Sequence, residues 1–210
     1  MNKVNYPVFD DQIDERVREI NRVTNQIHNV EKQIRNNNLS IDDYNCCFGN
    51  VCETLLNWTG HTYVGRNKDK ILKKAFQSFF ENLYEFLVYC KGNDSIELLQ
   101  EFAKKALYNG TLYRYLGYDY PVENKNEKVI PQYNDIFVSW SKNPDCSYLK
   151  TKLYGTRTEL TCNVKEPFYG IDLEAFGVSR GDEAEVVFPT IEKTIIDVKY
   201  IEEEQEEDEK

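Results

Sequence analysis

The chain has 210 residues, of which 40% are hydrophobic and 13% aromatic, so it can bury a core, and disorder throughout is not expected. Its formal net charge of −10 argues against a protein that coats nucleic acid, which needs a basic surface. No apolar run reaches the roughly 18 residues of a membrane span. No apolar segment follows Met1 either, so we expect no transmembrane helix, no secretory signal peptide and a cytoplasmic location.

The first half of the sequence carries the apolar spacing of helices. Isoleucine and valine recur at helical intervals from Ile13 to Ile34, which predicts an amphipathic helix and allows a short coiled-coil seam. Ser40 has the position of an N-cap for the next helix. The rest of this half is expected to comprise a loop over 57–67, a helix over 69–91, and a helix from Asp94 to Asn109–Gly110.

Strand patterns begin after Gly110. The expected strands are short and either apolar or alternating, and they cover 111–116, 136–138, one or two segments within 149–164, 183–188 and 194–201. Loops rich in proline, glycine or polar residues are expected over 119–133, 142–148 and 167–180. This order predicts an α+β fold, in which a helical N-terminal half is followed by a small mixed sheet.

Three regions follow from these patterns. Residues 1–109 form an expected helical lobe, residues 110–201 a strand-rich core, and residues 202–210 an acidic tail. The tail holds seven acids and one lysine, which is typical of a disordered, solvated segment and less typical of a binding tail for a basic partner. The six cysteines include no CxxC pair, so we expect reduced, buried thiols and no metal site.

Polar motifs interrupt three of the expected strands. Arg114 lies inside an apolar strand, Ser139-Trp140-Ser141 ends a strand, and Glu183-Ala184-Glu185 begins another. The serine motif is the only Ser-x-Ser in the chain, and the glutamate motif is the only Glu-x-Glu outside the tail. At the two-residue period of a strand, both serines share one face and both glutamates share one face, while Trp140 is expected to point into the core.

These motifs, in this order, resemble those of the Arg–Ser–Glu class of mono-ADP-ribosyltransferases. The stretch from Gly170 to Leu173, expected as a short loop, and Pro189 after the last apolar run are similar to the end of that domain. The resemblance covers about Gly110 to Ile201. It implies a β-sandwich of the ADP-ribosyltransferase type, with NAD as co-substrate.

The resemblance implies a role for each motif. A guanidinium fork matches phosphate oxygens, so Arg114 is expected at the pyrophosphate of NAD or an adjacent ribose, in preference to a core carboxylate. Ser139 would hold Glu185, which would contact the nicotinamide ribose and stabilise the oxocarbenium-like transition state. Glu183 would activate the incoming nucleophile. The expected NAD-binding residues are Arg114, Tyr115, Ser139, Ser141, Tyr148 and Tyr154.

The acceptor and the biological role stay open. Within the family, a glutamate at the position of Glu183 goes with transfer to arginine, so a protein acceptor is favoured, and Phe176 is a candidate to touch it. One alternative is transfer to nucleic acid or to a small molecule, and the acidic charge disfavours nucleic acid. The other is a non-enzymatic helical interaction protein with a degenerate transferase fold. A toxin, effector or phage protein is a hypothesis consistent with the small size.

Overall fold

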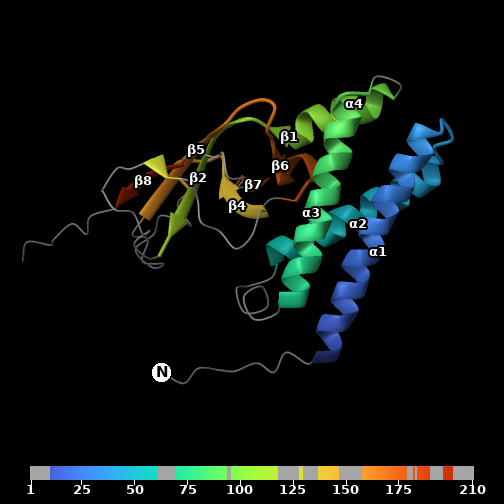
Figure 1. The fold of residues 1–210 in the computed structure, drawn as a ribbon, viewed down its shortest axis with the longest axis horizontal. Coiled ribbons are helices and arrows are strands. Elements are labelled where there is room, and N and C mark those ends of the chain that lie inside the picture. Colours follow the sequence, from blue (N-terminus) through green and yellow to red (C-terminus); the bar gives the residue numbers. More distant parts are fainter. Residues whose placement is uncertain are drawn as a thin grey trace, which may run out of the picture. The chain divides into compact units, whose positions relative to one another are not determined.

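The computed structural model describes residues 10–60, 70–93, 96–117, 128–129, 137–146, 158–178, 182, 184–189 and 196–200. The described chain combines four α-helices with an antiparallel sheet, which is an α plus β fold (Figure 1). It divides into two compact units: a helical unit of Met1–Ala106 with Ala175–Val178, and a sheet unit of Leu107–Glu174 with Ser179–Lys210. The helical unit therefore ends at Ala106 and takes back a short segment from the second half of the chain.

The helical unit contains α1 (Asp10–Arg35), α2 (Ile41–Gly60), α3 (Lys70–Lys91) and α4 (Glu97–Ala106). The apolar stripe of α1 is buried inside the unit, where Ile27 and Val30 are 1% and 2% exposed. Asn37 has a φ of 54° and ends α1 in a left-handed turn. Ser40 then caps α2, because its Oγ accepts the Asp43 N–H at 3.2 Å.

Two helix ends differ from the sequence-based expectation. Residues 57–60 continue α2, although a glycine and a polar run predicted a loop. Trp58 explains the difference, because its ring packs against Phe76 at 5.2 Å and Phe80 at 4.8 Å between centroids. The last helix ends at Ala106, before the expected Asn109–Gly110, and the chain passes directly into a strand.

The sheet unit contains β1 (Leu107–Tyr108), β2 (Gly110–Leu116), β3 (Lys128–Val129), β4 (Phe137–Ser141), β5 (Thr158–Val164), β6 (Gly170–Asp172), β7 (Glu185–Pro189) and β8 (Ile196–Tyr200). Their order across the sheet is β1-β6-β7-β4-β2-β5-β8-β3. Every described pairing is antiparallel, so the expectation of a mixed sheet is wrong.

Two segments expected as loops contain short strands. β3 lies within 119–133 and pairs with β8, and β6 lies within 167–180 and pairs with both β1 and β7. Gly170 is a turn signal in the sequence, but in the structure it allows β6 to approach the Val186 side chain of β7 closely. A Cβ atom at this position would lie 2.3 Å from Cγ1 of Val186 on β7, so only glycine fits without a shift.

One face of the sheet carries the core. Its buried members come from alternate positions of β2, β4, β5, β7 and β8: Leu112, Leu116, Val138, Trp140, Leu160, Cys162, Val164, Val186, Phe188 and Val198. Trp140 is 3% exposed, which confirms its expected place in the core. The two serines beside Trp140 alternate with it and therefore point to the opposite face.

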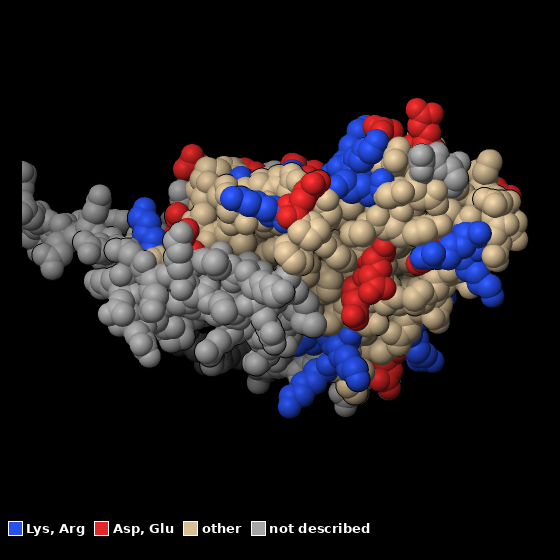
Figure 2. Space-filling model, turned by 45° about the horizontal axis from the view of Figure 1, so that its top comes forward, with Lys and Arg blue, Asp and Glu red and all other residues tan. Residues whose placement is uncertain are grey.

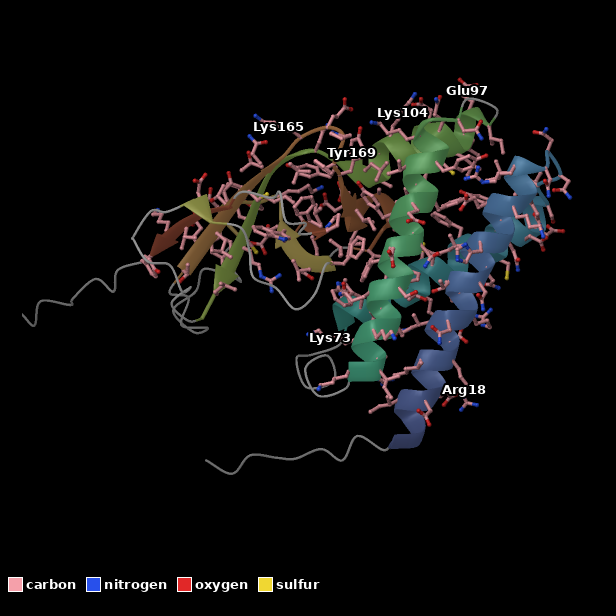
Figure 3. All side chains as sticks on the ribbon, in the orientation of Figure 1. Arg18, Lys73, Glu97, Lys104, Lys165 and Tyr169 are labelled. Carbon is pink, nitrogen blue, oxygen red and sulfur yellow. The ribbon has the colours of Figure 1, made fainter. Side chains whose placement is uncertain are left out.

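The visible surface mixes charges of both signs. Figure 2 shows Lys and Arg interspersed with Asp and Glu rather than gathered into one basic area on that face. In Figure 3, Tyr169 is labelled in the connection between β5 and β6, where its hydroxyl donates to Glu166 Oε1 at 2.9 Å. None of the described helices has both the length and the apolar character that crossing a membrane requires.

Candidate functional site

The three motif-bearing strands are neighbours in the sheet. β4 lies between β2 and β7, so the strands that carry Arg114, Ser139 and Glu185 are side by side although they are far apart in sequence. Ser141 is directly opposite Glu185 on β7 and Tyr113 on β2. The sheet topology therefore brings the three motifs onto adjacent strands.

Ser139 and Glu185 form a direct side-chain contact. The Ser139 hydroxyl donates to Glu185 Oε1 at 2.5 Å, across the β4–β7 pair. Glu185 is 7% exposed, so its carboxylate is held in a mostly buried position rather than at a solvated strand end. Hydrogen bonds to an ionised carboxylate are among the stronger ones in proteins. The contact is the one that the family resemblance implies, and the catalytic roles of both residues stay predictions.

Arg114 reaches the same serine from the other side. Its Nη1 donates to the main-chain carbonyl of Ser139 at 2.7 Å. Arg114 is opposite Leu160 in the β2–β5 pairing, so its backbone directs the side chain to the face that carries the core. The described pairing of β2 with β4 consists of one residue pair, Tyr113 with Ser141. The Arg114 guanidinium adds a hydrogen bond from β2 to the Ser139 carbonyl of β4. Arg114 therefore lies on the opposite face from the Ser139–Glu185 pair and meets it through the β4 backbone.

Ser141 turns the chain after β4. Its Oγ accepts the Asn143 N–H at 2.9 Å and donates to the Asn143 carbonyl at 3.0 Å, and the residue is 1% exposed. This local bonding is typical of serine in turns. The turn is then joined to the segment before β7, because Asn143 Nδ2 donates to the Asp182 carbonyl at 3.1 Å and the Lys142 N–H donates to the Ala184 carbonyl at 3.1 Å.

Tyr115 also holds this turn. Its hydroxyl donates to the Pro144 carbonyl at 2.5 Å, so β2 supports the turn that follows β4. Burial raises the pKa of the Tyr115 phenol, and the neighbouring Glu159 carboxylate adds to the shift. Tyr115 therefore acts on the shape of the site as a neutral hydrogen-bond donor.

The glutamate motif is not a regular strand. β7 begins at Glu185, and Ala184 has a φ of 42°, in the left-handed region that non-glycine residues rarely adopt. The described strand therefore begins at Glu185, and the expectation that Glu183 and Glu185 share one strand face stays a prediction. Glu183, Tyr148 and Tyr154 themselves lie outside the described residues.

A cation beside the site was not predicted. Lys142 follows the serine motif directly, and its ammonium lies 2.8 Å from Asp172 Oδ2 and also contacts Glu174. Burial opposes the charge, but the hydrogen bonds to the two carboxylates outweigh it, so the pKa of Lys142 is raised. The sequence shows Asp172 in the stretch before the glutamate motif, but only the structure reveals that its partner is Lys142.

Two further candidate features can be placed. Phe176 is 7% exposed and its ring packs between Phe48 and Phe102 in the helical unit, so the expectation that it touches an acceptor is wrong. Within the ranges that the structure describes, no three His, Cys, Asp or Glu side chains are grouped as metal ligands would be.

The comparisons with known proteins leave the sequence motifs and this geometry as the grounds for assigning a function: no family model, no curated protein and no solved structure matches the chain.

Proposed function

We propose that this chain cleaves the nicotinamide–ribose bond of NAD and transfers ADP-ribose to an acceptor. The observation that carries the proposal is the hydrogen bond from Ser139 Oγ to Glu185 Oε1, between two motifs that lie 46 residues apart in the sequence. A carboxylate fixed in a mostly buried position is the arrangement that electrostatic stabilisation of a developing cation requires. The adjacency of β2, β4 and β7 supports the finer proposal that the sheet is of the ADP-ribosyltransferase type.

In the proposed reaction, the bond between nicotinamide nitrogen and the ribose anomeric carbon breaks, and its electron pair leaves with neutral nicotinamide. The positive charge that develops on the ribose is stabilised by Glu185, which Ser139 orients. The acceptor nitrogen then forms the new bond to the anomeric carbon and loses a proton to Glu183. Arg114 lies on the other face of the sheet, so its proposed role here is to hold β4 through the Ser139 carbonyl, and its contact with the pyrophosphate stays a prediction.

An arginine side chain of a protein is the proposed acceptor. A guanidinium needs a carboxylate to orient it and accept its proton, and Glu183 comes two residues before Glu185. The negative net charge of the chain favours a cationic acceptor over nucleic acid.

The first test is release of nicotinamide from NAD by the wild-type chain and by the Glu185→Gln variant. This substitution keeps the shape of the side chain and removes its charge. Glu81→Gln is the matched control, because Glu81 is an exposed residue of α3. We expect release by the wild type and by Glu81→Gln, and loss of release in Glu185→Gln. Equal release by Glu185→Gln would contradict the role of Glu185.

Labelled NAD then identifies the acceptor. Label on polyarginine or a protein, resistant to nuclease and sensitive to protease, is the expected result. Label that nuclease removes, or that stays on a small molecule, would replace the arginine proposal with the alternative acceptors.

A wild-type chain that neither releases nicotinamide nor binds NAD would favour the non-enzymatic alternative. For that alternative, α1 offers little free seam, because the apolar residues of its central part, such as Val23 and Ile27 at 1% exposed, are buried within the helical unit.

A further inference from the structure

The strand that carries Glu185 has a neighbour on each side. β7 lies between β6 and β4 in the sheet (Figure 1). Asp172 of β6 is opposite Val186 of β7, and Val186 is opposite Trp140 of β4. Side chains of opposite residues lie on one face of a sheet, so the Asp172 carboxylate is on the core face with Val186 and Trp140. Glu185, one residue before Val186, points to the other face.

Lys142 crosses β7 on the core face. It follows Ser141, the last residue of β4, and its Nζ lies 2.8 Å from Oδ2 of Asp172 on β6. This ion pair joins the two neighbours of β7 and passes over the beginning of β7, on the face opposite to the Glu185 carboxylate. The main chain of Lys142 also contacts this part of the chain, because its N–H donates to the Ala184 carbonyl at 3.1 Å.

The ion pair is largely removed from solvent. The side chains of Lys142 and Asp172 are 20% and 12% exposed. Oδ1 of Asp172 accepts the Glu174 N–H at 3.1 Å, so the carboxylate is fixed at both oxygens. By contrast, the Lys104–Glu101 pair on α4 has side chains that are 45% and 55% exposed, and surface pairs of that kind contribute little.

The ammonium of Lys142 keeps its charge at this depth. Burial opposes the charge, but the hydrogen bonds to Asp172 and Glu174 outweigh it, so the pKa of Lys142 is raised. The ammonium also lies 5.8 Å from the ring centre of Tyr108 on β1, within the reach of a cation–π contact. The cation is therefore in place throughout the neutral pH range.

The position of Glu185 makes such a contact useful. Glu185 is the first residue of β7, and Ala184 before it has a φ of 42°. A residue in that conformation is strained and stays there only where its surroundings hold it. Ser139 orients the carboxylate of Glu185, but the backbone from which the carboxylate projects is held by the pairing with β4 and by Lys142.

We propose that Lys142 is a positioning residue, whose ion pair with Asp172 fixes the beginning of β7 and so places Glu185 for the cleavage of NAD. The inference rests on the proposed function, because it takes Glu185 as the group that stabilises the ribose cation. Lys142 acts through the backbone of β7 and needs no contact with NAD. Loss of its charge should therefore lower kcat for nicotinamide release and leave KM for NAD unchanged.

The experiment removes the charge from each partner in turn. Lys142→Met keeps an unbranched side chain without the ammonium, Asp172→Asn keeps the shape of the carboxylate, and a double variant combines them. Lys142→Arg restores a cation. Lys104→Met is the matched control, because it breaks an exposed lysine–glutamate pair on α4. Each variant is first shown to unfold cooperatively in urea. Asp172→Asn carries the test if Lys142→Met does not fold.

Hydrogen exchange of the main-chain amide at position 142 reports on its bond to the Ala184 carbonyl and needs no catalysis. After correction for intrinsic rates, we expect exchange to be roughly tenfold faster in Lys142→Met and in Asp172→Asn, as the loss of one hydrogen bond to a charged group predicts. Lys142→Arg should restore slow exchange, and Lys104→Met should leave it unchanged.

Nicotinamide release gives kcat and KM for the same variants. We expect kcat to fall by roughly tenfold or more in Lys142→Met and in Asp172→Asn at unchanged KM, because a misplaced Glu185 loses contacts that are made in the transition state. The double variant should lose no more than either single variant, since both act through one pair. Lys142→Arg should recover most of kcat, and Lys104→Met should keep all of it.

The outcomes separate the two proposals. No release by the wild type overturns the proposed function and the catalytic part of the inference, and exchange at position 142 then decides the structural part. Unchanged exchange in Lys142→Met and Asp172→Asn overturns the positioning of β7. Faster exchange with unchanged kcat overturns the role in NAD cleavage. A raised KM at unchanged kcat also overturns it, because Lys142 would then bind NAD itself.

Discussion

Removal of the Ser139 hydroxyl tests the contact on which the proposed site depends. Ser139→Ala deletes the donor that lies 2.5 Å from Glu185 Oε1 and leaves the backbone carbonyl that Arg114 contacts. Because Glu185 is 7% exposed, water can replace the lost donor only in part. The carboxylate then keeps the cost of burial without the hydrogen bond from Ser139.

The expected magnitude follows from the charge on the acceptor. A hydrogen bond to a charged group contributes about 1.5–3 kcal/mol, so the free energy of unfolding at pH 7 should fall by about that amount. If the same bond orients Glu185 in the transition state, kcat/KM for nicotinamide release should fall by roughly 10- to 150-fold, at about 1.4 kcal/mol for each factor of ten.

The assay is a double-mutant cycle in urea, joined to nicotinamide release. Ser139→Ala is measured in the wild type and in Glu185→Gln, where the acceptor is neutral and the cost should fall to about 1 kcal/mol. Ser78→Ala on α3 is the control, because the described contact of Ser78 uses its carbonyl. The same unfolding cost in both backgrounds, together with unchanged release by Ser139→Ala, would refute the reasoning.

Three further changes test other parts of the sheet and the core. Ala184→Gly should raise the free energy of unfolding by up to about 1 kcal/mol, because glycine relieves the φ of 42°; a lower urea midpoint would contradict this. Trp140→Phe should cost less than about 1 kcal/mol in urea unfolding, since it removes a buried indole N–H that has no hydrogen-bond partner; a loss above 3 kcal/mol, roughly a full cavity cost, would argue otherwise. Burial raises the pKa of Cys47 to about 11 and of Cys90 and Cys162 to about 12. The folded state therefore binds these protons more tightly than the unfolded state. The contribution of the protonated thiols to the free energy of unfolding is complete below the unfolded pKa near 9 and is lost as the pH rises toward 11–12. The loss is up to about 1.4 kcal/mol per thiol and pH unit. A urea midpoint that does not change between roughly pH 8.5 and 10.5 would contradict this predicted loss of stability.

Local patterns predicted the elements whose signals are local. The strand around Arg114 and the strand ending in Ser141 were expected from short apolar runs, and both are present. Ser40 marks the start of the second helix, because an N-cap depends on a single residue.

Features that depend on distant partners could not be predicted from the sequence. The extension of α2 through Trp58 needs the aromatic side chains of α3, which are almost twenty residues away. The left-handed Ala184 has no residue-type signal, because alanine does not favour that conformation. The sequence places Phe176 in a loop near an acceptor, since nothing in its neighbours shows that its partners are Phe48 and Phe102.

The return of Phe176 to the helical unit has a consequence for synthesis on the ribosome. The helices are complete at Ala106, but the Phe176 ring that packs against Phe48 and Phe102 emerges 70 residues later. At 5–20 residues per second, roughly the usual rate of elongation, the nascent helices lack that ring for several seconds. During this interval the exposed aromatic side chains are a target for chaperones, and an excised chain that stops at Ala106 keeps them exposed permanently.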